Sequence, residues 1–273
     1  MDNVSHSYGV GKFAKEVVKD CGFTIEAGKL TVMIGPSGCG KSTLIRLIAG
    51  FEKPSEGSIS IDGKPITGPG KDRLVVFQET ALFPWMSAYN NTLYGPRARG
   101  EDTPEIHREA QSLVERVGLS AFRNKYPTQL SGGMQRRVEL ARAMINNPKV
   151  MILDEPFRGL DAMTKALMQE YYSALHEEFH RTAFFVTTDI DEAIFMADRL
   201  IIVSNIPTRV RAVVEVDVPR PRRLVDIFEN DRANQIKMSA LSMLHEEAMK
   251  SFVGGSKAAS DFVDAYSKRT GKT

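Results

Sequence analysis

The sequence predicts an α/β fold with a mostly parallel sheet, because strand-like and helix-like segments alternate and a glycine-rich loop joins two of them. Apolar runs typical of buried strands recur along the chain, at residues 29–34, 74–77, 150–153, 183–187 and 200–203. Helix-like segments precede each of the last two runs, and another follows the first. Helical crossovers place neighbouring strands parallel, which favours a mostly parallel central sheet.

The first third of the chain adds shorter elements. An apolar segment at 21–25 precedes the first of these runs, and a helix is expected at 41–49. Residues 58–61, followed by Asp62 and Gly63, indicate a short strand and a tight turn.

A helical block interrupts the strands at about 84–147, with its clearest helices at 105–117 and 135–145. It predicts a helical subdomain inserted into the sheet domain. Residues 209–218 then alternate polar and apolar side chains, as an antiparallel strand does. We therefore expect one domain over residues 1–218.

The remaining residues are expected to form a linker and an appendage. Residues 219–223 carry two prolines and predict the linker, and 224–273 predict a helical C-terminal appendage. A helix ending at Gly254-Gly255 would place five apolar side chains on one face: Ile236, Leu241, Leu244, Ala248 and Phe252. A second short helix is expected from Ser260. Two roles stay open for the appendage, packing against the main domain and regulation or subunit docking.

Composition excludes several classes of function. Lys plus Arg number 36 and Asp plus Glu 34, and this net charge of +2 argues against nucleic acid as the main partner. Two cysteines are too few for a disulfide framework and fit a reducing cytosol. No apolar run approaches the ~18 residues that span a bilayer. Residues 1–8 are polar and unlike a secretory signal.

The glycine-rich loop fits the phosphate-binding pattern G-x-x-x-x-G-K-[ST]. Glycines let several N–H groups point at one anion, and the following helix adds its positive N-terminal end. Lys41 is expected to reach the terminal phosphates and the Ser42 hydroxyl to hold Mg²⁺. The predicted nucleotide-binding residues are Gly35, Pro36, Ser37, Gly38, Cys39, Gly40, Lys41, Ser42 and Thr43.

Two acids follow the apolar run at 150–153. A strand end beside the phosphate loop is a place where an acid meets Mg²⁺, so Asp154 is the predicted metal partner. Glu155 is then positioned to orient or deprotonate the attacking water.

A second phosphate-binding element opens the helix after Leu130. Ser131 would cap this helix, while Gly132 and Gly133 expose backbone N–H groups at its positive end. One nucleotide needs only one phosphate loop, so a second such element suggests that two chains share two nucleotides. The segment also fits an ordinary helix N-cap.

Together and in this order, the motifs resemble the ATP-binding subunit of an ABC transporter over roughly residues 4–218. The resemblance implies a P-loop NTPase core with an N-terminal antiparallel β part and the inserted helical subdomain. Its motifs are Walker A at 35–43, the Q-loop glutamine Gln78, the signature at 130–135, the Walker B acids Asp154 and Glu155, and the D-loop at 159–161.

The resemblance also implies how ATP and Mg²⁺ are used. Two subunits pair head to tail, two copies of this chain being expected and pairing with a different ATP-binding subunit being the alternative. ATP then lies between one Walker A motif and residues of the other chain's signature, Ser131, Gly132, Gly133 and Gln135. Gln78 would contact Mg²⁺ and the attacking water, and Tyr8 would stack on adenine. Packing of Tyr8 against the sheet edge is the alternative.

The remaining implied partners belong to a transport complex. Transmembrane permease subunits would dock a coupling helix near residues 83–85, although Trp85 could instead be subdomain core. A periplasmic substrate-binding protein would act indirectly, and no nucleic acid is expected. The chain would lie peripherally on the cytoplasmic face of the bacterial inner membrane.

Two short segments indicate a subgroup of the family, whereas two residues depart from the family's usual sequence. Residues 81–85 and 218–222 look like those of bacterial importers for nitrate, sulfonate or taurine. Thr188 stands where the family usually has a histidine that holds the γ-phosphate, so we expect it to donate one weaker hydrogen bond and hydrolysis to be slow. Arg158 replaces a small D-loop residue and is expected to be a solvated surface arginine or a functional departure.

Two other functions compete with this interpretation. The segment from His176 to His180 fits the zinc-protease pattern H-E-x-x-H, but it falls on an expected outer helix without a recognisable third ligand. A soluble ABC-type ATPase unconnected with transport is the nearer alternative. Such proteins usually carry a long coiled coil or two cassettes, and this chain has neither.

Overall fold

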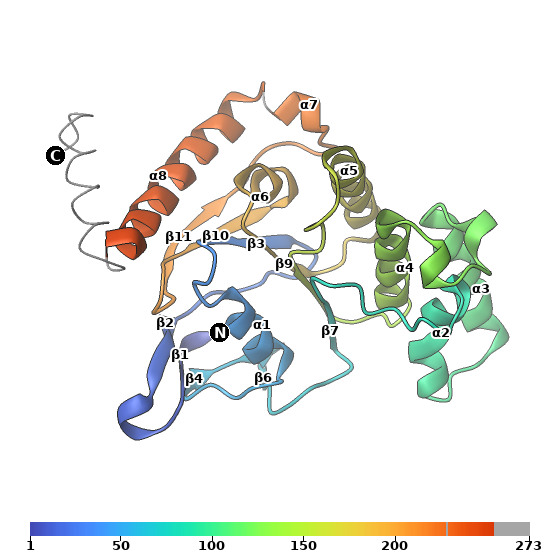
Figure 1. Ribbon diagram of the computed structural model, residues 1–273, viewed down its shortest axis with the longest axis horizontal. Helices are drawn as coiled ribbons and strands as arrows, with labels where there is room; N and C mark the ends of the chain where they lie inside the picture. Colours follow the sequence, from blue (N-terminus) through green and yellow to red (C-terminus); the bar gives the residue numbers. More distant parts are fainter. Residues whose placement is uncertain (228, 254–273) are drawn as a thin grey trace.

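A computed structural model describes residues 1–227 and 229–253. Within them, the central sheet has six strands in the order β11-β10-β3-β9-β8-β7 (Figure 1). The five strands from β10 to β7 run parallel to one another, and β11 runs antiparallel to β10, which confirms the predicted mostly parallel α/β fold. The strands are β3 (Leu30–Ile34), β7 (Arg73–Val76), β8 (Val150–Asp154), β9 (Ala183–Thr187), β10 (Arg199–Val203) and β11 (Val210–Glu215).

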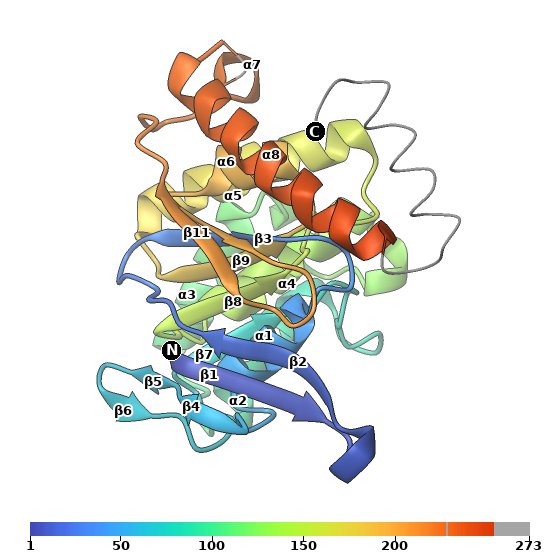
Figure 2. The ribbon, with the colours of Figure 1, turned by 90° about the vertical axis from the view of Figure 1, so that its left-hand side faces the viewer.

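A separate antiparallel sheet precedes this core and lies beside it (Figure 2). It consists of β1 (Asp2–Tyr8), β2 (Lys15–Cys21) and β4 (Glu56–Ser58), with the 3₁₀ turn η1 (Gly11–Phe13) between the first two. Strands β5 (Ser60–Ile61) and β6 (Lys64–Pro65) form a hairpin around the predicted turn at 62–63.

The apolar segment at 21–25 does not continue as a strand, because β2 ends at Cys21. Phe23 instead stacks on Phe184 of the central sheet, with 5.6 Å between ring centroids. Apolar side chains in this segment therefore serve packing between the two sheets.

The helical block lies between β7 and β8 in sequence and beside the sheet in space (Figure 1). Ser87, Thr103 and Ser131 each cap a helix by accepting a backbone N–H with the side-chain oxygen, which fixes where the helices begin. The elements are α2 (Ala88–Ala98), α3 (Pro104–Arg116), the 3₁₀ turns η2 (Ser120–Phe122) and η3 (Pro127–Gln129), and α4 (Gly132–Met144).

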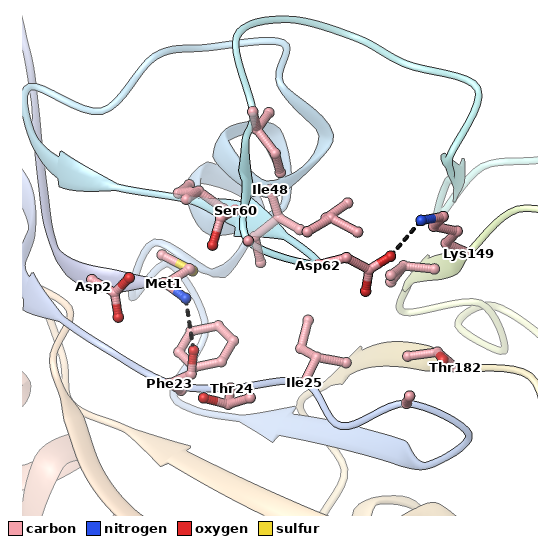
Figure 3. A pocket seen from close by; sticks show the side chains of 16 residues that line it. Met1, Asp2, Phe23, Thr24, Ile25, Ile48, Ser60, Asp62, Lys149 and Thr182 are labelled. Atoms are coloured by element: carbon pink, nitrogen blue, oxygen red, sulfur yellow. Dashed lines mark hydrogen bonds and ion pairs between the residues drawn. The ribbon is translucent and has the colours of Figure 1, made fainter.

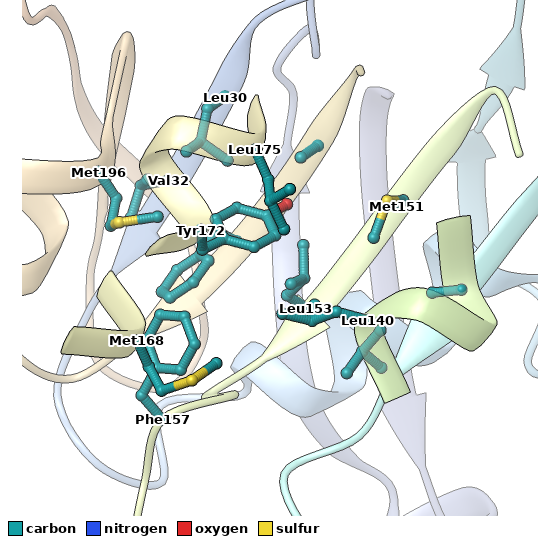
Figure 4. Packing of buried hydrophobic residues seen from close by; sticks show 14 of the residues in the cluster. Leu30, Val32, Leu140, Met151, Leu153, Phe157, Met168, Tyr172, Leu175 and Met196 are labelled. Atoms are coloured by element: carbon teal, nitrogen blue, oxygen red, sulfur yellow. The ribbon is translucent and has the colours of Figure 1, made fainter. Parts of the chain in front are cut away.

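Side chains of the sheet alternate between two hydrophobic clusters. Leu30 and Val32 of β3 face α5 (Ala162–Phe179) and α6 (Ile190–Met196), where they pack with Tyr172 and Met196 (Figure 4). Met33 faces the opposite cluster, which includes α1 (Lys41–Ala49). Burial on both faces explains why the parallel strands are continuously apolar.

The C-terminal helix α8 (Asp231–Val253), preceded by α7 (Leu224–Ile227), packs across α6 and β10. Its buried face differs from the predicted one: Ile236 and Leu244 pack on the core, but Leu241 is 45% exposed and Ala248 is exposed. Because Leu241 follows Ile236 by five residues, its side chain points to a different side of the helix. Residues spaced three or four apart share the buried face, which Ala233, Ala240 and Glu247 complete.

The side chain of Phe252, the Gly254-Gly255 stop and the helix expected from Ser260 lie outside the described residues. Within the described part of the chain, no helix combines the length and apolar character that a bilayer crossing requires.

The segment expected to be a linker is packed against the core. Arg222 is buried, and its guanidinium donates to five main-chain carbonyls at the end of α6 and after β11: Ile194, Phe195, Ala197, Val216 and Val218. Burial lowers the pKa of Arg222 to about 10, so the group still carries its charge at neutral pH. Arg222 thereby joins the core to the start of the appendage.

Replacing this residue tests that role. Arg222→Met leaves the five carbonyls without their donor, and unsatisfied buried acceptors cost ~1–3 kcal/mol each before water re-enters. We expect a loss of about 3 kcal/mol in the free energy of unfolding, measured by urea denaturation. Arg223→Met is the matched control, since the side chain of Arg223 is 73% exposed, and it should change stability little.

Candidate active site

The glycine-rich loop curls at the carboxyl end of β3 and leads into α1. Gly38 and Gly40 adopt φ angles of +74° and +101°, in the left-handed region that favours glycine. A Cβ on Gly40 would lie 2.4 Å from Thr208 Oγ1, and one on Gly35 would lie 2.5 Å from Val203 Cγ2. Both conformation and close packing therefore require glycine in this loop.

Lys41 places its ammonium inside that curl. Its Nζ donates to the carbonyls of Gly35 and Pro36 at 2.8 Å each, and the residue is only 6% exposed. Ser42 follows in the first turn of α1 and is exposed. An ammonium, an exposed hydroxyl and a helix N-terminus thus converge where phosphates are expected.

Thr208 supports the loop from outside and was not foreseen. It is fully buried, its hydroxyl lies 2.9 Å from the carbonyl of Val17, and it also contacts the carbonyl of Cys39. The contact spans 169 positions of sequence, so no local pattern points to it.

The two acids lie at the carboxyl end of β8, beside β9 in the register Asp154↔Val186. Glu155 has a φ of +41° and leaves the strand direction directly after Asp154. Burial and the neighbouring charge of Glu155 raise the pKa of Asp154, while Lys41 opposes the shift. Asp154 and Lys41 are therefore within electrostatic reach of each other.

Thr188 follows β9 at the same edge of the sheet and is exposed. Thr187, the preceding residue, is buried, and its Oγ1 accepts the N–H of Asp189 at 3.0 Å. Asp189 then caps α6 and accepts a bond of 2.8 Å from Lys165 Nζ. The position of Thr188 at the site edge is therefore fixed by its two neighbours.

Gln78 and Glu155 are brought together by Arg158. Arg158 Nη1 lies 3.1 Å from Glu155 Oε2 and 3.5 Å from Gln78 Oε1. On the other side, buried Arg136 donates to the carbonyls of Phe77 and Gln78 at 2.8 and 2.6 Å. Arg158 is thus a largely exposed arginine, as one of the two alternatives expected, and it also forms an ion pair with Glu155.

The signature segment lies against the D-loop. Ser131 caps α4 by accepting the N–H of Met134. A Cβ on Gly133 would lie 2.8 Å from Thr164 Cγ2, and one on Gly132 would lie 3.5 Å from Leu160 Cδ2. Both motifs therefore share one surface of the chain.

Gln135 turns inward beneath the signature segment. Its Nε2 donates to the carbonyls of Pro127 and Leu130 at 2.9 and 3.2 Å, and its Oε1 accepts from Thr80. This arrangement gives Gln135 a supporting role behind the loop.

Tyr8 ends β1 near the first turn of α1 and is 38% exposed. Its hydroxyl donates to Glu52 at 2.6 Å and lies 3.4 Å from Thr43 Oγ1. The ring therefore borders the phosphate loop with one part still open to solvent.

A different cavity, of about 380 Å³, lies at the amino ends of the strands and has a mixed polar and apolar lining (Figure 3). Phe23, Ile25 and Ile48 line it, and an ion pair between Asp62 and Lys149 closes one side. The phosphate loop lies at the opposite ends of the strands, so this cavity belongs to the packing between the two sheets.

The two histidines of the H-E-x-x-H segment face different surroundings. His176 is buried, with its Nε2 3.3 Å from Asp198, whereas His180 is exposed at the end of α5. Among the described residues, no group of three or more His, Cys, Asp or Glu side chains is arranged to hold a metal ion.

A phosphate loop, two acids on a neighbouring strand end and a mostly parallel sheet define a P-loop nucleotide-binding protein. The ABC transporter family matches residues 18–158 of this chain, more than half of its length. The chain therefore belongs to the ABC transporter family, as an ATP-binding subunit with ATPase activity. The resemblance inferred from the motifs is confirmed, and neither the protease nor the transport-independent ATPase is favoured.

Individual relatives agree with this assignment. The nitrate import ATP-binding protein NrtD of Synechococcus elongatus is 42% identical over 231 residues, which cover 84% of each chain. The aliphatic sulfonates import ATP-binding protein SsuB of Bacillus licheniformis is 38% identical over 232 residues, covering 85% of this chain and 90% of its own.

A solved structure shows the same architecture. The ATP-binding cassette MJ0796, in a dimeric post-hydrolysis state bound to ADP and Pi, superposes with a TM-score of 0.67 at 29% identity. The match covers 80% of this chain and 98% of that one.

Proposed function

We propose that this chain hydrolyses ATP with Mg²⁺ to drive a bacterial importer of a small anion or a related nitrogen or sulfur compound. The observation that carries the ATPase chemistry is the placement of Lys41, Asp154 and Glu155 at one edge of the sheet. The substrate class rests on the 38–42% identity to the nitrate and sulfonate import proteins.

The acids at the site suit a bound Mg²⁺ ion. Burial, and next the neighbouring charge of Glu155, raise the pKa of Asp154, and a divalent cation bound there would stabilise the ionised carboxylate. Ser42 and Asp154 would hold the ion together with phosphate oxygens, and Gln78 would contribute its amide oxygen. The ion supplies neutralisation of phosphate charge, while Glu155 holds and deprotonates water.

Two copies of the chain are proposed to share the nucleotides. The signature segment and the D-loop occupy one surface, which suits a head-to-tail pair in which Ser131, Gly132 and Gly133 approach the partner's ATP. Gln135 would act from behind by holding this segment. Tyr8 would stack on adenine at the open side of its ring.

An exposed aromatic group is the proposed docking surface for the permease. Trp85 is 68% exposed and packs at 5.4 Å from Phe83, which in turn lies 4.4 Å from Tyr94 between ring centroids. Exposure of Trp85 disfavours the alternative of subdomain core. An apolar face of a permease helix would cover it, placing the chain on the cytoplasmic face of the inner membrane.

Co-expression with a candidate permease tests the function. We expect the chain to co-purify with membranes only in the presence of the permease, and Trp85→Ala to weaken that association. Phe13→Ala is the matched control, because Phe13 is 89% exposed on the hairpin between β1 and β2. A chain that stays off the membrane with every candidate permease would contradict a role in import.

Thr188 leads to a separate prediction about rate. A histidine at this place would add a preorganised donor, and one such donor is worth up to ~3 kcal/mol, or about a hundred-fold in rate. Thr188→His should therefore raise kcat for ATP hydrolysis without changing ATP affinity, as measured by phosphate release and calorimetry. A variant no faster than a parent that already hydrolyses rapidly would mean that other groups compensate for the threonine.

A further inference from the structure

Arg158 contacts the two side-chain oxygen atoms that the proposed reaction needs. Its Nη1 lies 3.1 Å from Glu155 Oε2 and 3.5 Å from Gln78 Oε1. Under the proposed function, the first oxygen accepts a proton from water and the second contacts Mg²⁺. Neither oxygen can do so fully while it is directed at the guanidinium.

The surroundings make Arg158 the movable member of this group. Its side chain is 62% exposed, whereas that of Glu155 is 12% exposed. The main chain at Gln78 is fixed by buried Arg136 through a bond of 2.6 Å. Arg158 also borders an open hollow of about 420 Å³ between the Q-loop and Gly132, so it has space to leave.

We propose that Arg158 is a positioning residue that restrains hydrolysis, holding Glu155 and Gln78 away from water and Mg²⁺ until the second copy of the chain closes on this surface. The inference rests on the proposed function. Arg158 directly precedes the D-loop, which lies beside the signature segment, the surface proposed to meet the partner. Closure there would draw Arg158 away and free both oxygens together.

The expected effect on the hydrolysis rate follows from the solvent exposure of the ion pair between Arg158 and Glu155. Exposed ion pairs are weak, and their typical strength corresponds to about a two- to five-fold change in rate. Because such pairs are screened by salt, the restraint should fade as ionic strength rises. ATP affinity should stay unchanged, since the contacts of Arg158 are with Glu155 and Gln78 rather than with the phosphate loop.

The experiment compares steady-state phosphate release by the full-length parent and four variants at low and high salt. Arg158→Ser removes the charge, Arg158→Lys keeps it, and Glu155→Gln reports the background. Arg108→Ser is the matched control, because Arg108 forms an exposed pair with Glu105 at 2.7 Å on α3. Thermal unfolding and ATP titration are measured on each protein.

We expect Arg158→Ser to show a kcat about two- to five-fold above the parent at low salt, with the same KM, and a ratio near one at high salt. Arg158→Lys and Arg108→Ser should behave like the parent. A slower Arg158→Ser would mean that the guanidinium assists hydrolysis, and an equal rate would mean that the pair has no effect; either result overturns the inference while leaving the ATPase function intact. If the parent is no more active than Glu155→Gln, the function and the inference fall together.

Discussion

Glu155→Gln is expected to abolish steady-state ATP hydrolysis while leaving MgATP binding in place. The amide that replaces the carboxylate cannot accept a proton from water, and a general base contributes about 10²- to 10⁴-fold to such a reaction. Binding should survive, because Lys41, Ser42 and the glycines of the phosphate loop are untouched. Phosphate release measures the first effect, and calorimetric titration with MgATP measures the second.

Glu105→Gln serves as the control for this variant, since its side chain is 70% exposed on α3 and lies in the helical block. It should hydrolyse ATP at the parent rate. A Glu155→Gln protein that did the same would remove Glu155 from the catalytic role, and the base would have to be sought elsewhere.

The second large effect is expected at Lys41. Lys41→Ala deletes an ammonium held inside the phosphate loop, and charge-assisted hydrogen bonds are worth about 1.5–3 kcal/mol each. ATP affinity should therefore fall ten-fold or more, as measured by titration of the isolated chain. Lys64→Ala, at an exposed position of the small hairpin, should leave affinity unchanged.

Ser131→Arg should affect the pairing of two chains rather than the ATP affinity of one chain. The new side chain stands at the N-terminus of α4, where it blocks approach of a second chain without touching the phosphate loop of its own chain. We expect ATP affinity of the single chain to be nearly intact and ATP-dependent pairing to be lost. Equal losses of affinity in Lys41→Ala and Ser131→Arg would argue against a nucleotide shared between chains.

The parts of the fold and site that sequence could predict are those carried by contiguous residues. The phosphate loop and the acids at 154–155 follow apolar strands directly, and carboxyl ends of parallel strands meet at one edge. Thr188 was singled out only by the family resemblance, and it lies at that edge because it follows β9.

Long-range polar contacts could not be predicted in this way. Thr208 supports the phosphate loop through a contact 169 positions away, and Arg136 fixes the main chain of Gln78 from 58 positions away. From the sequence, Arg222 was expected to lie in a linker, but its side chain is buried among main-chain carbonyls. Such roles depend on which backbone groups lack partners after folding, and residue spacing carries no record of that.

The central claim is that two copies of this chain enclose ATP between Walker A of one and the signature of the other. Molar mass by light scattering, measured on Glu155→Gln after size-exclusion chromatography with MgATP or with MgADP, tests it most directly. The account predicts twice the chain mass of 30.3 kDa with MgATP, the single mass with MgADP, and the single mass whenever Ser131→Arg is added. A single mass in MgATP, or a dimer that persists with Ser131→Arg, would contradict it.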